Sequence, residues 1–351
     1  MAAESDNEME MLPAAGPIVQ TAKDFKSDQM VRWCPGCGDF AILATVQKML
    51  PTLNIPKEKY VFVSGIGCSS RFPYYMNTYG FHTIHGRALT LATGIKGSNP
   101  DLQVWVVTGD GDGLSIGGNH LLHALRRNVD VKILLFNNRI YGLTKGQYSP
   151  TSELGKKTKS SPMGSVDTPL NPIAVALASE ASFVARAVDT DLPFLSDVLT
   201  RAAHHKGSAF IEIFQNCIVF NDGAFESVVA KDVREEKMMK VAHGKPMIFG
   251  AKKDKGIVLN GLEPEVVSFD PANPPKNLLI HDEKAPSATL ANFLAHMAEP
   301  VPQGIFRDVA RPALHELMDA QIDQARKEKP ADLQKLLKGP ETWTVAAAGK
   351  A

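Results

Sequence analysis

The sequence predicts an α/β fold in which helices cover both faces of a mostly parallel sheet, followed by a C-terminal extension. Short apolar runs rich in β-branched residues alternate with segments whose apolar residues recur every three or four positions, a pattern typical of alternating strands and helices. Glycine or polar residues directly follow several runs, and in parallel sheets such positions meet at one ligand-binding edge. After about residue 222 the alternation gives way to short pieces separated by Gly, Pro and charged residues.

The composition is that of an ordinary globular protein. Of 351 residues, 44% are hydrophobic and 22% are charged, and 38 basic residues balance 38 acidic ones. We therefore expect neither nucleic acid nor a membrane surface as a partner. No apolar run approaches the ~20 residues of a transmembrane helix. The acidic N-terminus lacks the features of a signal peptide, so we expect a cytoplasmic protein.

We divide the chain into three parts. Residues 1–25 are acidic, then rich in Pro and Ala, and without periodicity, which predicts a flexible arm. Residues 26–221 hold the alternating pattern and form the predicted cofactor-binding domain. Residues 222–351 form the predicted C-terminal extension, which we expect to contact a partner subunit and in which residues 289–297 and 314–326 have helical periodicity.

The elements of the central domain follow in order from the N-terminus. A Cys-Pro-Gly-Cys turn precedes the first helix, and the long segment 143–172 is polar and aperiodic. A structureless stretch of that length is usually functional in a compact domain. We expect strands at residues 60–64, 104–107, 132–136, 183–188 and 209–214, and helices at residues 40–50, 88–95, 116–127, 173–179 and 193–204.

Hard oxygen ligands follow two of these strands. Asp110 lies in a Gly-Asp-Gly turn after the strand at 104–107, and Asn138 follows the strand at 132–136. A carboxylate, an amide oxygen and a backbone carbonyl suit Mg²⁺, which takes its remaining ligands from water and a bound phosphate. Glycines let a diphosphate approach the backbone, and the following helix N-terminus favours negative charge. The pattern predicts a magnesium–diphosphate site.

The same stretch resembles a known family. GDG followed by NN at this interval is similar to the motif of the thiamine diphosphate fold, and GDGDGLSIGGNH…RRN…NNRIYGLTKGQ resembles the β subunits of 2-oxoacid:ferredoxin oxidoreductases over roughly residues 26–225. The 2-oxoglutarate enzymes are the most similar in that family. The resemblance implies that Asp110, Asn138 and the carbonyl of Ile140 hold Mg²⁺. It places the following residues around the cofactor: Gly67, Ser69, Ser70, His85, Gly109, Gly111 and Asp112.

Four cysteines, at positions 34, 37, 68 and 217, are the only ones in the chain. Disulfides are improbable in a reducing compartment, and unrelated buried thiols do not explain a Cys-x-x-Cys pair in a Pro-Gly turn. A structural zinc site usually has two Cys-x-x-Cys pairs, whereas a [4Fe–4S] cluster accepts dispersed ligands. In the family that this chain resembles, Cys34, Cys37, Cys68 and Cys217 match the ligands of a [4Fe–4S] cluster.

The resemblance implies oxidative decarboxylation of 2-oxoglutarate to succinyl-CoA. Thiamine diphosphate would stabilise the carbanion left when CO₂ departs, the cluster would pass electrons to ferredoxin, and coenzyme A would take the acyl group. Lys145, in the Leu-Thr-Lys-Gly-Gln segment, would pair with a substrate carboxylate. The chain lacks a second α/β domain to supply the glutamate that activates thiamine, so the resemblance implies an α subunit and an (αβ)₂ heterotetramer.

Three other functions stay open from the sequence. The first is the same chemistry on pyruvate or another 2-oxo acid. The second is a nonoxidative thiamine-dependent decarboxylase or synthase with structural zinc. The third is an electron-transfer module without thiamine, which would leave the pairing of Asp110 with Asn138 unexplained.

Overall fold

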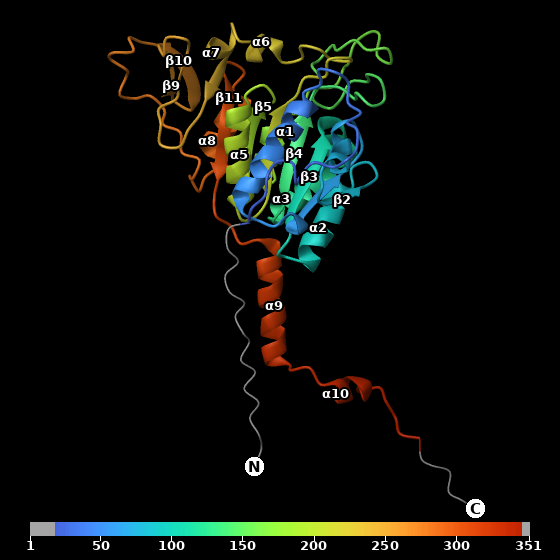
Figure 1. The fold of residues 1–351 in the computed structure, drawn as a ribbon. Coiled ribbons are helices and arrows are strands. Elements are labelled where there is room, and N and C mark those ends of the chain that lie inside the picture. Colours follow the sequence, from blue (N-terminus) through green and yellow to red (C-terminus); the bar gives the residue numbers. More distant parts are fainter. Residues whose placement is uncertain (1–17, 346–351) are drawn as a thin grey trace, which may run out of the picture.

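The computed structural model describes residues 18–345 and is built around an eight-stranded sheet (Figure 1). The first six strands along the chain all run parallel to one another. This confirms the predicted α/β class. In spatial order the strands are β2 (Tyr79–His82), β1 (Tyr60–Ser64), β3 (Gln103–Gly109), β4 (Lys132–Asn137), β6 (Ala209–Phe214), β5 (Phe183–Val188), β11 (Val301–Asp308) and β7 (Met238–Lys240).

Helices cover both faces of the sheet, each over its own apolar core. Because side chains alternate across a strand, Trp105 of β3 packs with α1 and α5, whereas Val104 and Val106 pack on the opposite side with α2, α3, α4 and α8. The helices are α1 (Asp39–Met49), α2 (Ala88–Ser98), α3 (Gly118–Arg126), α4 (Pro172–Ala178), α5 (Leu192–His204) and α8 (Thr289–His296).

Shorter helical turns join these elements. Two of them begin at positions with predicted ligand roles: the 3-10 helix η3 (Ser69–Tyr75) follows Cys68, and the π-helical turn η4 (Asp112–Ile116) follows the Gly-Asp-Gly turn. The remaining short turns are η1 (Leu50–Leu53), η2 (Lys57–Lys59), α6 (Glu226–Val229) and α7 (Arg234–Lys237).

The five strands expected in the central domain are all present, and no helix or strand occurs within 143–171. Strand β2 was not expected. Its four residues are all exposed, and it forms the outer edge of the sheet beside β1. Its formation depends on pairing with β1 rather than on its own sequence.

Part of the predicted extension, which begins at residue 222, belongs to the main sheet. Strand β11 pairs antiparallel with β5, and β7 pairs with β11, so both complete the main sheet. Phe306 of β11 is buried in the core. The rest of this region adds a small antiparallel sheet of β8 (Ile248–Phe249), β9 (Lys255–Asn260) and β10 (Glu263–Ser268).

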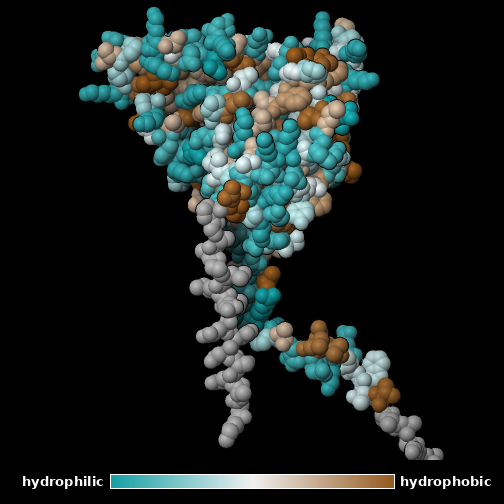
Figure 2. All heavy atoms as spheres, in the orientation of Figure 1, coloured by the Kyte–Doolittle hydropathy of each residue, from teal (hydrophilic) through white to brown (hydrophobic). Residues whose placement is uncertain are grey.

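The C-terminal helices α9 (Leu314–Glu328) and α10 (Leu333–Leu337) project away from the body (Figure 1). Neither helix buries a residue. The exposed leucines of α10 belong to the hydrophobic patch on this projection in Figure 2.

The N-terminal arm predicted for residues 1–25 lies mostly outside the described residues. Where the chain is described, it contacts the domain: the Ile18 amide donates to Asn54 Oδ1 at 2.9 Å, and Phe25 is fully buried. The domain therefore begins earlier than residue 26. Among the helices of residues 18–345, none is both long and apolar enough to cross a bilayer.

Candidate cofactor and thiol site

The carboxyl ends of β3, β4 and β6 lie side by side, because these strands are parallel neighbours. They bring Asp110, Asn138 and Cys217 to one edge of the sheet. A small cavity of about 40 Å³ opens there. Its lining contains most of the predicted cofactor-site residues: Gly67, Cys68, Ser69, His85, Gly109, Asp110, Gly111, Asp112, Asn138 and Ile140, together with Ile66, Tyr141, Leu143 and Thr144.

The Asp110 carboxylate is buried and held by two hydroxyl groups. Ser149 Oγ and Thr151 Oγ1 donate to its Oδ2 at 2.5 and 2.6 Å. Burial raises the pKa of Asp110, and the two hydroxyl donors oppose that rise. Within residues 18–345 no lysine or arginine forms an ion pair with this carboxylate. A buried carboxylate without a cationic partner fits a site that takes a metal ion.

The two consecutive asparagines after β4 have different partners. Asn137 Oδ1 lies 2.9 Å from Thr151 Oγ1, the hydroxyl that donates to Asp110. Asn138 Nδ2 donates to Gln215 Oε1 at 2.9 Å, and Asn138 Oδ1 accepts from the Ile140 amide at 3.2 Å. The predicted ligands Asp110, Asn138 and Ile140 thus lie together at the cavity.

Asp112 organises the loops around the cavity. Its Oδ1 accepts from the amides of Ile66 and Gly86 and lies 2.6 Å from His85 Nδ1, while Thr108 Oγ1 donates to its Oδ2 at 2.7 Å. The resemblance placed Asp112 against a diphosphate. Its carboxylate accepts from these protein donors, and Asp112 also lines the cavity.

Position 111 requires glycine, because the Tyr141 ring lies too close to the backbone to leave room for a side chain. A Cβ at this position would lie 2.2 Å from the ring of Tyr141, whose hydroxyl donates to the Gly111 carbonyl at 2.9 Å. The Tyr141 ring therefore closes one side of the cavity. Leu143 and Thr144, on the same segment, also line it.

The two serines after Cys68 occupy different places. Ser69 is buried and lines the cavity, as does Gly67. Ser70 is fully buried but does not line the cavity, and its hydroxyl has no hydrogen-bond partner. The structure therefore brings Ser69, but not Ser70, to the predicted cofactor site.

The four cysteines gather beside this cavity. A Cβ added to Gly142 would lie 3.5 Å from the Sγ atoms of both Cys68 and Cys217, so these two sulfurs are at most 7 Å apart. Cys34 and Cys37 lie on one tight turn, in which the Cys37 amide donates to the Cys34 carbonyl at 3.0 Å. All four thiols are free.

The environment of the thiols is apolar and acidic. Burial and the nearby Asp39 carboxylate raise the pKa of Cys68 to about 12 and raise that of Cys37 further. Burial also raises the pKa of Cys217, although the amides of residues 219, 220 and 221 oppose this rise. Amides that face a sulfur stabilise thiolate ligands. As placed here, no three or more His, Cys, Asp or Glu side chains of residues 18–345 form a group that could hold a metal ion.

Lys145 lies near the site but outside the cavity lining. Its backbone has a positive φ of 74°, and its side chain is exposed. The structure brings the neighbouring Leu143 and Thr144 to the cavity, but not Lys145.

Several residues of the site were not identified from the sequence. Ser149 and Thr151, which hold Asp110, belong to the long polar segment whose three hydroxyls within four residues (Ser-Pro-Thr-Ser) were an available signal. Gln215 is buried; it accepts from Asn138, and its Nε2 lies 3.3 Å from Cys37 Sγ. No local pattern marks Gln215, because its partners are 77 and 178 positions away.

Comparison with known proteins agrees with this geometry. A family model described as "Thiamine pyrophosphate enzyme, C-terminal TPP binding domain" matches residues 65–213. The 2-oxoglutarate oxidoreductase subunit KorB of Mycobacterium tuberculosis is 53% identical over 338 residues, which are 93% of this chain and 89% of that protein. The 2-oxoacid:ferredoxin oxidoreductase subunit beta of Saccharolobus solfataricus is 39% identical over 75% of this chain and 95% of its own length.

A solved structure is also similar over nearly the whole chain. It is the 2-oxoglutarate:ferredoxin oxidoreductase from Magnetococcus marinus with 2-oxoglutarate, coenzyme A and succinyl-CoA bound. The match has a TM-score of 0.73 and 31% sequence identity, and it covers 96% of this chain and 98% of that one.

Proposed function

This chain belongs to the β subunits of the 2-oxoacid:ferredoxin oxidoreductases, and we propose that its enzyme converts 2-oxoglutarate to succinyl-CoA by oxidative decarboxylation. The choice of 2-oxoglutarate is supported by the names of the KorB relative and of the similar solved structure. The observation that carries the proposal is the position of two of the four free thiols, Cys68 and Cys217, at the cavity that contains Asp110 and Asn138.

Asp110, Asn138 and the carbonyl of Ile140 would hold Mg²⁺, and Gly67, Ser69, Gly109 and Gly111 would face the diphosphate of the coenzyme. Thiamine diphosphate, when bound, supplies the electron sink for decarboxylation. The buried, unpaired carboxylate of Asp110 supports this assignment, because a divalent cation would compensate its charge. Ser149 and Thr151 would keep that carboxylate oriented before the ion arrives.

Coenzyme binding requires the cavity to open. Its present volume of about 40 Å³ holds little more than water, whereas small-molecule sites usually measure about 300–1,000 Å³. Tyr141 closes one wall through its contact with Gly111. We infer that the segment from Tyr141 to Gly146 moves outward when thiamine diphosphate binds.

Cys34, Cys37, Cys68 and Cys217 would hold a [4Fe–4S] cluster that passes electrons to ferredoxin. The donor chemistry suits iron, because all four thiols are free and Cys68 also lines the coenzyme cavity, but the thiols would have to come closer together than they lie here. Binding to iron would deprotonate these thiols despite their raised pKa values, since metal ligation favours the thiolate. The neighbouring amides at residues 219–221 would support Cys217 in that state.

The active enzyme would be an (αβ)₂ heterotetramer. Residues 18–345 contain one large parallel sheet and no second α/β domain, so an α subunit would supply the glutamate that activates thiamine. Coenzyme A would accept the acyl group.

The test uses the complex purified with its partner chain and separates the two sites. We expect Cys217→Ser to lower the iron and acid-labile sulfide content while thiamine diphosphate still binds. We expect Asp110→Asn to weaken thiamine diphosphate binding by tenfold or more while iron is retained, because it removes the charge that would hold Mg²⁺. The matched control for the second variant is Asp101→Asn, an exposed residue before the amino end of β3, whereas Asp110 follows the carboxyl end of the same strand.

The visible spectrum then tests the reaction. We expect the cluster absorbance to bleach when 2-oxoglutarate and coenzyme A are added together. Zinc in place of iron, or a spectrum that stays unchanged with both substrates, would refute the oxidative function. Bleaching by pyruvate but not by 2-oxoglutarate would refute 2-oxoglutarate as the substrate and leave the oxidative reaction unchallenged.

A further inference from the structure

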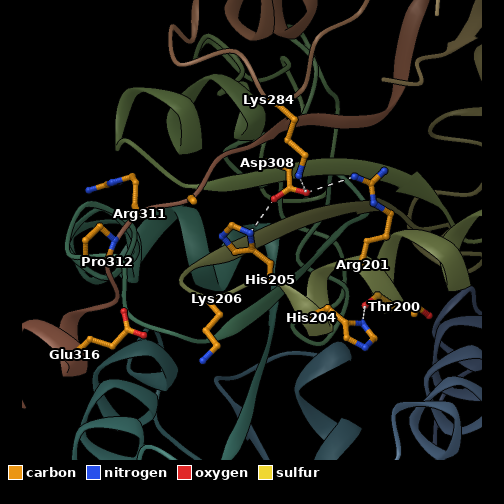
Figure 3. Close-up of a pocket in the computed structure, with 11 residues that line it drawn as sticks. Thr200, Arg201, His204, His205, Lys206, Lys284, Asp308, Arg311, Pro312 and Glu316 are labelled. Carbon is orange, nitrogen blue, oxygen red and sulfur yellow. Dashed lines mark hydrogen bonds and ion pairs between the residues drawn. The ribbon is translucent and has the colours of Figure 1, made fainter. Parts of the chain in front are cut away.

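A second, larger cavity lies at the opposite edge of the sheet (Figure 3). Its volume is about 760 Å³, within the usual range for small-molecule sites. Basic side chains dominate its charged lining, in which Arg201, Lys206, Lys284 and Arg311 surround Asp308 and Glu316.

The fold places this cavity far from the coenzyme. His205 precedes β6, and Asp308 ends β11 opposite the start of β5, so both mark the amino edge of the parallel strands. Cys217 follows the other end of β6. The six residues of β6 separate the two edges by about 20 Å, at ~3.3 Å per residue. A ligand here cannot contact the reacting atoms of the proposed site.

Asp308 anchors one wall. Lys284 Nζ lies 2.6 Å from its Oδ2, Arg201 Nη2 lies 3.4 Å from the same oxygen, and His205 Nδ1 lies 2.9 Å from Oδ1 (Figure 3). Burial alone would raise the pKa of Asp308, but the hydrogen bonds and charges of His205 and Lys284 lower it to about 2. The Asp308 carboxylate is therefore ionised at neutral pH.

Two cations of the lining have no carboxylate partner within the described residues. Lys206 forms no ion pair. Arg311 donates to the backbone carbonyls of Glu180 and Arg126 rather than to an acid. Arg201 also pairs with Glu283 behind the lining, so four cations face three carboxylates and one positive charge is in excess, although the whole chain has a net charge of zero. Such a local excess favours an anionic ligand.

We propose that this cavity binds a phosphorylated small molecule of nucleotide size. Phosphate suits a mixed lining of guanidinium and ammonium groups, which bind its oxygens through charge-assisted hydrogen bonds. A dicarboxylate would fill only a small part of the volume. Because the cavity lies at the far edge from the coenzyme, its ligand is an effector rather than a substrate, and this proposal is independent of the reaction proposed above.

The experiment uses the assembled complex, saturated with thiamine diphosphate and Mg²⁺, and ATP as the probe. Calorimetric titration measures ATP affinity, and hydrogen–deuterium exchange locates the site. We expect saturable binding and slower exchange in residues 200–206 and 308–316. The variant Lys206→Gln/Lys284→Gln should weaken ATP binding by about tenfold or more, because it removes two charged donors.

The matched control is Lys237→Gln/Lys253→Gln, which removes the same charge from exposed ion pairs elsewhere. It should leave ATP affinity within about twofold. Tripolyphosphate should compete with ATP, because the phosphates carry the recognition. Absence of saturable ATP binding, equal affinity in the wild type and the Lys206/Lys284 variant, or tighter binding of citrate than of ATP would each overturn the proposal.

Discussion

A single buried amide joins the two halves of the candidate site. Gln215 accepts from Asn138 with Oε1 and lies 3.3 Å from Cys37 Sγ with Nε2. Asn138 is a proposed magnesium ligand, and Cys37 is a proposed iron ligand. If both proposals hold, this side chain would help to set the distance between the coenzyme and the thiols, on which electron transfer between them would depend.

Substitution of Lys145 tests whether this side chain binds a carboxylate of the substrate. If it pairs with a carboxylate of the 2-oxo acid, Lys145→Ala should raise KM for 2-oxoglutarate about tenfold or more, because one charge-assisted hydrogen bond is lost. The KM for coenzyme A and the kcat should each change by less than about twofold, because the lost interaction would stabilise the bound substrate and the transition state equally.

Steady-state kinetics of the assembled complex give both constants. Lys157→Ala, an exposed lysine on the same long segment, is the control and should leave both KM values unchanged. An unaltered KM for 2-oxoglutarate in Lys145→Ala would exclude the role, in agreement with the exposed position of this side chain.

Among the elements, β4 contains an unusual buried charge. Lys132 is almost fully buried, and its Nζ lies 2.7 Å from Asp130, whose carboxylate is also 2.8 Å from Lys96 of α2. The trio ties a helix to a central strand. Burial lowers the pKa of Lys132, and the neighbouring Asp130 carboxylate opposes this decrease. For Asp130, burial by itself would raise the pKa of the carboxyl group. The charges and hydrogen bonds of Lys132 and Lys96 outweigh burial and lower this pKa.

Asp130→Asn should therefore destabilise the fold strongly. Removing one partner of a buried pair typically costs about 3–5 kcal/mol, and we expect that loss in chemical denaturation at pH 7. Because the pKa of Asp130 is lowered on folding, its contribution is present above about pH 4 and is lost as the pH falls below that value. The difference in stability between wild type and variant should shrink on acidification.

Asp101→Asn provides the control for this prediction. Asp101 forms an exposed pair with Lys59 at 3.7 Å, and such pairs contribute at most about 1 kcal/mol. A loss in Asp130→Asn as small as in Asp101→Asn would contradict the stabilising role of the trio.

For the molecule as a whole, the compact body and the C-terminal projection contribute very differently to stability. The body includes β11, whose Phe306 is 1% exposed. The projection buries none of its helical residues and exposes Leu336 and Trp343 by about 80%. Burial supplies most of the stability of a domain, so the projection adds little to it.

Ending the chain after Lys329 should therefore leave Tm within about 2 °C of the full chain, as measured by calorimetry. Phe306→Ala, by contrast, should lower Tm by about 10 °C, because it leaves a cavity in the core. A large loss of Tm on truncation would mean that α10 packs on the body.

The order of elements was predictable because its signals are local. The strands at 60–64, 183–188 and 209–214 have the expected bounds, since each is a short buried run between turns. The common edge of Asp110, Asn138 and Cys217 also followed from sequence, because parallel strands connected by helices end on the same side.

The place of β11 in the sheet and the hydrogen-bond partners of the site residues depend on tertiary contacts. β11 joins the sheet through residues more than 100 positions from β5, and nothing in its own composition selects that neighbour. Gln215, Ser149 and Thr151 acquire their roles from partners distant in sequence. Periodicity records which face of an element is buried, whereas hydrogen-bond partners depend on which elements the folded core brings together.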